Sequence, residues 1–548
     1  MKKVMLKIRY IAVVLCSVGV LTSCNDFLST IPLNEIVLEN FWENEEELNS
    51  VVMSCYSGMA QGDFLTRLIL WGELRSDNVV EGIITGDIPY VNNDQLRDML
   101  EGNIQQDYYI ADWSCFYRVI NRCNTVLYYA PQVLERDPDF KTSEWEYIKA
   151  EMLTLRALCY FYLVRSFRDV PFVTEPTIDD SQELKVAAAD PDVVLNQLVK
   201  DLQEAELTAL KEFPKEAAST YSYTKARVTK QTVWSLLADI YLWMERYDEC
   251  VVYCEKVIEA KVAEAEENKM SYEGNYPLIA NQRTSSSNNI HQAYNQIFGD
   301  RYSFESIFEM PFGYNYEDKR DALRSYYGAW DMEPGVMVAS PFIAEGAKDG
   351  NEIYKKGDIR SIESFDWSNT SINKYVCYHI SDNESSAKMK SKYSNWIFYR
   401  LTDVMLMEAE ALVERNDSID GDPTDLKKAF DLASSVYHRS NLKEELKFSG
   451  DLTAQDGLRK FVLEERQREL MFEGKRWFDL VRKARREGNN SAMLDLATRK
   501  YTSPGTVKSK WIKPDMLYLP IHENELKVNP LLKQNPEYIT DKTITTAK

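Results

Sequence analysis

TVWSLLADIYLW (residues 232–243) and ECVVYCEKVIEA (residues 249–260) are two apolar segments separated by the polar break MERYD (residues 244–248). In both segments the apolar residues recur every three or four positions, which is the period of an α-helix with one buried face. Ala238 and Cys250 are small enough to let two such helices approach closely, while larger residues fill the groove beside them. The sequence therefore predicts a helical hairpin at this place.

The hairpin at residues 231–260 resembles a tetratricopeptide repeat. With Trp234 counted as repeat position four, Leu237, Ala238 and Tyr241 fall at positions seven, eight and eleven. The small and apolar positions of the second helix are then taken by Cys250 and Cys254. Because each such hairpin leaves one apolar face open, several hairpins must stack to bury a core.

The helical period continues elsewhere in the chain. It predicts helices over residues 151–168, 192–210, 399–414, 425–437 and 457–485, the last one interrupted near Gly474. Residues 261–395 are the least helical and contain most of the Ser, Asn and Gly clusters. We expect a mainly α-helical protein, an α-α superhelix of tetratricopeptide-like hairpins, over which residues 261–395 form an irregular, loop-rich layer.

Composition excludes several classes of function. The 548 residues include 86 acidic and 65 basic side chains, giving a net charge of −21. An excess of acid argues against a nucleic-acid partner, because binding phosphate requires a basic surface. The four histidines are scattered, so a histidine-rich metal site is not expected; the seven cysteines outside residues 1–24 form no CxxC motif, so neither a zinc ribbon nor a disulfide framework is expected. Cys250 and Cys254, one helical turn apart, are either a metal pair or, as we prefer, small buried residues.

The first residues predict export. Four basic residues, Lys2, Lys3, Lys7 and Arg9, precede the apolar run at residues 11–21, which is too short to span a bilayer. The run ends in Leu21-Thr22-Ser23-Cys24, which resembles a bacterial lipobox. We therefore expect residues 1–23 to be a signal peptide and Cys24 to carry the lipid. The remainder, residues 24–548, is expected to be one domain with an N-terminal part at about 24–225 and a C-terminal part at about 226–548.

Short blocks recur in a fixed order along almost the whole chain. They include Glu73-Leu74-Arg75-Ser76-Asp77, Leu155-Arg156-Ala157, Gly357-Asp358-Ile359-Arg360, Tyr399-Arg400-Leu401-Thr402-Asp403, Glu464-Glu465-Arg466-Gln467-Arg468-Glu469-Leu470 and Phe472-Glu473-Gly474-Lys475-Arg476-Trp477-Phe478-Asp479. In this order they resemble the SusD/RagB family of outer-membrane nutrient-binding lipoproteins. One departure is Arg168, where family members often have glycine.

The resemblance implies a fold, a location and a partner. It implies about four tetratricopeptide-like hairpins cradling an irregular, loop-rich ligand-binding half. It also implies a lipid-anchored position on the outer membrane, facing the cell exterior, beneath which a SusC-like TonB-dependent transporter barrel is the expected partner. The family captures oligosaccharides or, in some members, peptides, and performs no chemistry of its own.

The block at residues 464–479 also permits an enzymatic interpretation, because glycosidases use paired carboxylates. Its acids, however, alternate with Arg466, Arg468, Lys475 and Arg476 at spacings of three and four residues. Such spacing predicts ion pairs, which lower the pKa of a carboxyl group, whereas a catalytic acid needs a raised pKa. We interpret the block as structural. Arg156, Arg400 and Asp403, on otherwise apolar helices, are likewise expected to have partners that lock the hairpins to the ligand-binding half.

Candidate ligand contacts lie in two aromatic-rich stretches. Amphipathic rings beside short polar residues suit sugars, because the ring face stacks while polar groups hydrogen-bond the hydroxyls. From residues 290–345 and 71–113 we select Trp330, Tyr327, Tyr326, Tyr302, Tyr314, Asp77 and Arg75. Trp330 is the first choice, since Gly328 and Ala329 leave its face accessible. A role in folding competes for Asp77, and a place in the core competes for the rings.

The sequence thus predicts a cell-surface glycan-binding lipoprotein that passes oligosaccharides to a SusC-like transporter. Two alternatives remain open: a member that binds peptides or glycopeptides, and a protein-interaction scaffold without a small ligand. An enzyme is disfavoured, because no nucleophile–base constellation, metal motif or phosphate loop occurs in the sequence. No cofactor is expected.

Overall fold

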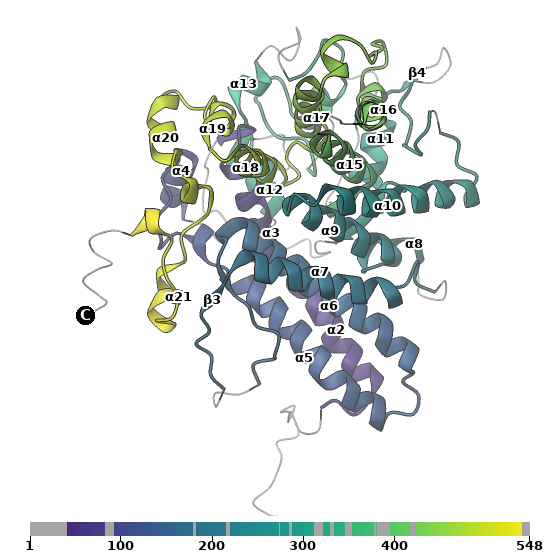
Figure 1. Ribbon diagram of the computed structural model, residues 1–548, viewed down its shortest axis with the longest axis vertical. Coiled ribbons are helices and arrows are strands. Elements are labelled where there is room, and N and C mark those ends of the chain that lie inside the picture. Colours follow the sequence, from purple (N-terminus) through teal and green to yellow (C-terminus); the bar gives the residue numbers. More distant parts are fainter. Residues whose placement is uncertain are drawn as a thin grey trace, which may run out of the picture.

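The computed structural model describes residues 41–82, 92–178, 182–214, 220–272, 274–283, 288–311, 322–328, 334–345, 353–376, 380, 395–416 and 422–539. Ten long helices make up the helical half of this described part (Figure 1). They are α2 (Glu45–Met59), α5 (Ser114–Arg136), α6 (Thr142–Phe167), α7 (Pro191–Thr208), α9 (Lys230–Trp243), α10 (Tyr247–Glu267), α15 (Leu401–Arg415), α16 (Pro423–Ser440), α17 (Gln455–Leu470) and α18 (Arg476–Glu487).

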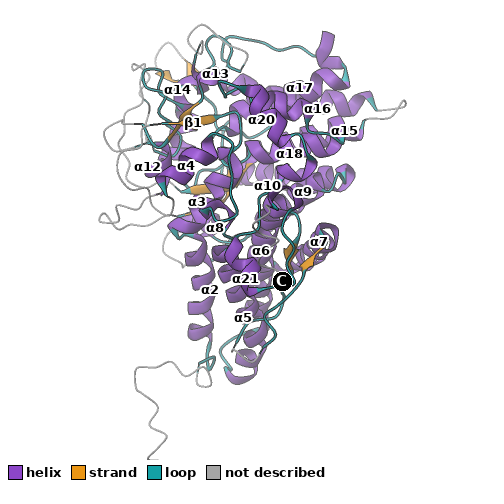
Figure 2. Cartoon of the chain, turned by 90° about the vertical axis from the view of Figure 1, so that its left-hand side faces the viewer, coloured by secondary structure: helices purple, strands orange, loops and turns teal. Residues whose placement is uncertain are grey.

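These helices pack largely on their neighbours in the chain. Helix α2 packs on α5, α5 on α6, α6 on α7, α9 on α10, and α15 on α16, while α7 contacts α9 and α10 contacts α15 across the longer connections. Helix α17 then packs on both α15 and α16. Figure 2 shows α2 and α5 at one end of the molecule and α15, α16 and α17 near the other. The expected stack of helical hairpins is therefore confirmed.

The hairpin predicted at residues 231–260 has the expected form. Helices α9 and α10 meet at a turn in which Glu245 has a φ of 59°. Ala238 and Cys250 are completely buried, which allows the close approach that small residues were expected to permit. The Sγ atoms of Cys250 and Cys254 lie 4.0 Å apart. Both cysteines are completely buried among apolar neighbours, as expected of small packing residues.

Two helix boundaries differ from the predicted ones for identifiable reasons. The helix expected at 399–414 begins at Leu401, because Trp396–Arg400 form the strand β8, which pairs with β6 (Ser306–Met310). The helix expected from residue 151 begins earlier, at Thr142. Its first turn is marked by Glu144 and not by regularly spaced apolar residues, so the apolar period did not reveal it. The long helix at 457–485 is interrupted as predicted, with Gly474 at a φ of 70° between α17 and α18.

The other half of the molecule consists of short elements. Each sheet in the described part has two antiparallel strands: β1 (Val79–Glu81) with β7 (Met337–Ala339), β2 (Val170–Pro171) with β3 (Ala188–Ala189), β4 (Gln282–Arg283) with β5 (Asn288–Asn289), and β6 with β8. This half also contains short helices: α3 (Gly62–Ile69) with the π-helical turn η3 (Leu70–Leu74), α4 (Asn93–Leu100), α8 (Thr220–Ala226), α11 (Gln292–Tyr294), α12 (Ala322–Tyr327), α13 (Pro341–Ala344), α14 (Arg360–Ser364), α19 (Ser491–Ala497), α20 (Pro504–Trp511) and α21 (Glu523–Val528).

The two halves share one core. A single cluster of buried apolar side chains runs from α2 to the C-terminal segment around Tyr538. Figure 2 shows the irregular elements, including α12, α14 and β1, beside the upper helices. In the described part of the chain, no helix combines the length and the hydrophobicity needed to cross a bilayer.

Candidate functional site

The ends of several segments that carry predicted ligand contacts meet at the β1–β7 pair. In this pair Glu81 faces Met337, and the Gly82 amide donates a hydrogen bond to the Val336 carbonyl at 2.9 Å. Gly328 and Pro334 form a further antiparallel bridge. Residues 82, 328 and 334 are the described residues that adjoin positions 83–91 and 329–333 in the sequence.

Two glycines make this close approach possible. A Cβ atom on Gly82 would lie 2.2 Å from the Gly335 carbonyl oxygen, and one on Gly335 would lie 2.5 Å from the Tyr326 carbonyl oxygen. Neither distance is compatible with a side chain, so both positions require glycine. We call residues 79–82, 326–328 and 334–339 the loop base. The first choice among the ligand contacts, Trp330, and also Tyr314 lie outside the described residues, in segments that border α12 and the loop base.

Tyr326 and Tyr327 correct the sequence-based selection. Both side chains are 0% exposed, because α12 packs between α3 and β7. The Tyr327 hydroxyl donates to the Phe472 carbonyl at 3.0 Å, and burial raises the pKa of both phenols. These two rings are core residues that support the loop base, and the prediction that they touch a ligand is wrong. Tyr302, by contrast, is half-buried, with a φ of 46°, and its amide donates to Glu309.

Asp77 and Arg75 are also internal. Asp77 is 0% exposed and accepts from Arg476 Nε at 2.8 Å and from Arg499 Nη2 at 2.7 Å. Burial alone would raise the pKa of this carboxyl group, but the two guanidinium groups hold it well below its usual range. Arg75 donates to the Leu517 carbonyl at 2.8 Å and lies over the Trp477 ring, and burial lowers its pKa to about 10. Neither side chain is placed to meet a ligand.

The blocks that contain these residues pack directly against each other. A Cβ atom on Gly72 would lie 2.1 Å from the Gly474 carbonyl oxygen, so the two backbones touch. The Gly474 amide donates to Glu73 Oε1 at 3.0 Å. We call residues 72–77 together with 472–477 the motif junction. Two of the most distinctive sequence blocks, about 400 positions apart, are thus the two sides of one structural contact.

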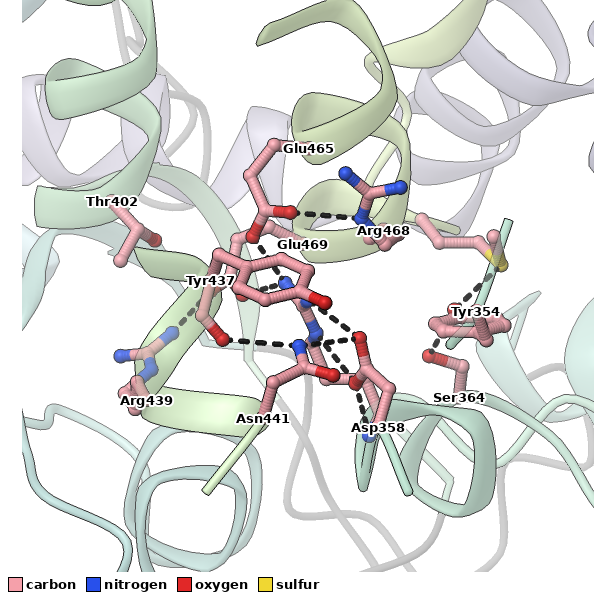
Figure 3. Close-up of polar contacts among 12 residues, drawn as sticks. Tyr354, Asp358, Ser364, Thr402, Tyr437, Arg439, Asn441, Glu465, Arg468 and Glu469 are labelled. Atoms are coloured by element: carbon pink, nitrogen blue, oxygen red, sulfur yellow. Dashed lines mark hydrogen bonds and ion pairs between the residues drawn. The ribbon is translucent and has the colours of Figure 1, made fainter. Parts of the chain in front are cut away.

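Glu465 and Glu469 of the 464–479 block lie in a buried ion network (Figure 3). Glu469 accepts from Arg400 Nη1 at 2.6 Å and from Arg360 Nη1 at 3.1 Å, and it also pairs with Arg439. These cations hold the pKa of Glu469 well below its usual range, against the opposing effect of burial. Glu473, paired with Arg400 and Lys374, has a lowered pKa as well. The ion pairs predicted for this block are confirmed, and the lowered pKa of Glu469 does not suit the general acid of a glycosidase.

The interior of this network leaves little space. A cavity of about 20 Å³ lies among its charged side chains, beside Arg360, Lys374, Arg400 and Glu469. This volume accommodates one water molecule, not a sugar ring. The network therefore joins elements together and does not bind a glycan.

The expected partners of the isolated charges are present. Arg156 pairs with Asp201 at 2.6 Å, and Asp403 pairs with Lys475 at 3.0 Å. Arg156, however, joins α6 to α7, so it locks one hairpin to the next and not to the irregular half. The network partners Lys374 and Arg439 were not selected from the sequence, since each lies in a segment with no motif that would mark it.

Comparisons with known proteins agree with this architecture. A family model described as "SusD family" matches residues 245–538, and one described as "Starch-binding associating with outer membrane" matches residues 26–242. A SusD-like protein of Formosa agariphila is 25% identical over 560 residues, covering 96% of this chain and 98% of that protein.

Solved structures show the same fold. A SusD superfamily protein of Bacteroides vulgatus superposes with a TM-score of 0.67 at 20% identity, covering 91% of this chain and 100% of that one. A structure described as a laminarin-binding SusD-like protein has a TM-score of 0.61 at 20% identity, covering 90% and 99%. Since the SusD-family model alone spans more than half of the residues, this chain belongs to the SusD/RagB family.

Proposed function

We propose that this protein is a cell-surface lipoprotein that binds glycans and passes oligosaccharides to a SusC-like TonB-dependent transporter. Family membership supports the proposal, as does the structural neighbour described as laminarin-binding. The description of the N-terminal family model, which names starch binding and the outer membrane, points in the same direction. Attachment would occur through Cys24, and the protein would have no catalytic role.

The observation that favours a binding site at the loop base is the convergence of chain segments there. Gly82, Gly328 and Pro334 bring the ends of two segments together, and a buried layer formed by Tyr326 and Tyr327 supports them. Trp330 and Tyr314 belong to segments that border this region, and in this proposal they form the aromatic surface for the sugar.

Retention on immobilised polysaccharides tests the ligand. We expect retention on at least one neutral glycan, with loss in Trp330→Ala and recovery in Trp330→Phe, because the ring face supplies the contact. Tyr128→Ala is the matched control, since Tyr128 is an aromatic residue on α5 that is 47% exposed and far along the chain from the loop base. If Tyr128→Ala lowers retention as much as Trp330→Ala does, the assignment of the site fails.

Two further measurements test the location and the alternatives. Cys24→Ser should release the protein from the membrane fraction, and a barrel protein should co-purify with the wild-type chain extracted in detergent. Retention on peptides and not on glycans would favour the peptide-binding alternative. Co-purification of the barrel without any retention would favour an interaction scaffold.

A further inference from the structure

A second, larger cavity lies among helices α17, α18 and α19, and none of its described lining residues belongs to the loop base. Its volume is about 380 Å³, within the range of small-molecule sites in proteins. Figure 1 shows α18 and α19 side by side, with α17 nearby. Its basic lining residues are Arg459, Lys460, Arg476, Lys483, Arg486 and Arg499.

The net charge of the residues that line this cavity is opposite in sign to the net charge of the whole chain. Six basic residues line the cavity but only three acidic ones, Asp456, Glu464 and Glu487, whereas the protein carries a net charge of −21. Other acids that neutralise the basic groups are not among the lining residues. Asp77 pairs with Arg476 and Arg499, Glu414 pairs with Arg459 and Arg486, and Glu410 also pairs with Arg486. Guanidinium and ammonium groups therefore outnumber carboxylates on the surface that a ligand would meet.

One lining side chain has an unused donor. Arg476 is 3% exposed, and its Nε bonds Asp77, but its Nη1 is shielded from solvent and has no hydrogen-bond partner in the described part of the chain. A buried cationic donor without a partner is costly, because its hydration is lost without replacement. An anion in the adjoining cavity would reduce that cost.

The remaining lining residues exclude a stacked sugar. Leu463, Leu496 and Ile353 contribute apolar surface, and no aromatic ring is among the described lining residues. Without an aromatic ring to stack on, the affinity for a ligand must come from charge and from close packing around a small molecule. A compact ligand with a carboxylate fits these walls better than a neutral glycan chain does.

We propose that the cavity between α17, α18 and α19 binds a compact organic anion whose carboxylate meets the basic wall formed by Lys483, Arg486, Arg499 and Arg476. Lys483 and Arg486 have side chains that are 17% and 18% exposed, so their charges act in a partly desolvated site, where attraction is stronger than in water. The proposal does not depend on glycan binding at the loop base.

Calorimetry with D-glucuronate and glucose tests the proposal, since the two probes differ mainly in the carboxylate. We expect glucuronate to bind, with an affinity that falls as salt is added, and glucose to give no signal. Lys483→Gln should raise the Kd of glucuronate at least tenfold. Ala492→Trp, at a half-buried lining position on the short helix α19, should block the cavity and abolish binding.

Lys427→Gln provides the matched control. Lys427 pairs with Asp431 four residues later on α16, just as Lys483 pairs with Glu487 on α18, but it does not line the cavity. Its removal should leave the Kd unchanged, and circular dichroism should show that all variants are folded. The proposal is overturned if glucuronate fails to bind, if glucose binds equally, or if Lys427→Gln weakens binding as much as Lys483→Gln.

Discussion

Replacing Asp77 with asparagine removes the negative charge that faces two buried or half-buried guanidinium groups. Arg476 and Arg499 approach the Asp77 carboxylate within 2.8 Å and 2.7 Å, and Gln467 donates to it at 3.1 Å. Asparagine keeps the shape and one acceptor oxygen but leaves the cations without their counter-charge. The variant therefore separates a structural role of Asp77 from a role in ligand binding.

The expected loss is large because the pair is buried. Removing one partner of a buried ion pair costs about 3–5 kcal/mol, since the remaining charge stays desolvated. For a chain of 548 residues that unfolds as one unit, the unfolding entropy is on the order of 1 kcal/mol per kelvin, so Tm should fall by about 3–4 °C. Differential scanning calorimetry resolves a change of this size.

The pH dependence supplies a second readout. The pKa of Asp77 is lower in the folded chain than the value of about 3.9 expected when unfolded, so the folded state holds fewer protons. The contribution of Asp77 to stability is therefore fully present above that pH and is lost as the pH falls further. Asp77→Asn should remove this part of the acid sensitivity, and the difference in Tm between the two proteins should shrink toward pH 3.

Asp495→Asn is the control, because Asp495 pairs with Lys508 on the surface and is 67% exposed. Its Tm should match that of the wild type, as is usual for exposed pairs. Folded Asp77→Asn should also retain glycan binding with unchanged affinity. An unchanged Tm combined with lost binding would refute our reasoning and return Asp77 to the ligand site.

Three further predictions test other features of the fold. Gly72→Ala should cost about 3 kcal/mol or more, because its Cβ would overlap the Gly474 backbone, whereas Gly505→Ala on α20 meets nothing and should be neutral or slightly stabilising in urea unfolding. Burial raises the pKa of Glu73 to about 7, so the folded state favours the protonated carboxyl group. The free energy of unfolding of the wild type should therefore fall as the pH rises from 5 to 7. Glu73→Gln should flatten that slope by up to about 1.4 kcal/mol per pH unit. Arg168 has a φ of 68° and a ψ of −75°, a strained backbone conformation for a residue with a side chain. Arg168→Gly should therefore raise the Tm by about 1 °C. Arg168→Ala keeps the strain and loses the ion pairs of Arg168, so it should lower the Tm.

The helical hairpins could be predicted because their signal is local. The apolar period of residues 232–243 and 249–260 reflects contacts within three or four positions, and the structure has α9 and α10 there. Helix α5 was not predicted, although it has 23 residues, because its polar stretch around Asn121-Arg122 obscures the period. The charge alternation in the block at 464–479 likewise predicted pairing before the partners were known.

The partners themselves were decided by tertiary structure. Asp77 and Arg75 look like exposed polar anchors in the sequence, yet packing of the motif junction encloses them beside residues about 400 positions away. Tyr326 and Tyr327 are adjacent on α12 and point in different directions, yet both are buried, because α12 packs against both α3 and β7. A sequence states which side chains prefer to be buried or charged. Which surface covers them depends on contacts between distant segments, and no local pattern encodes those.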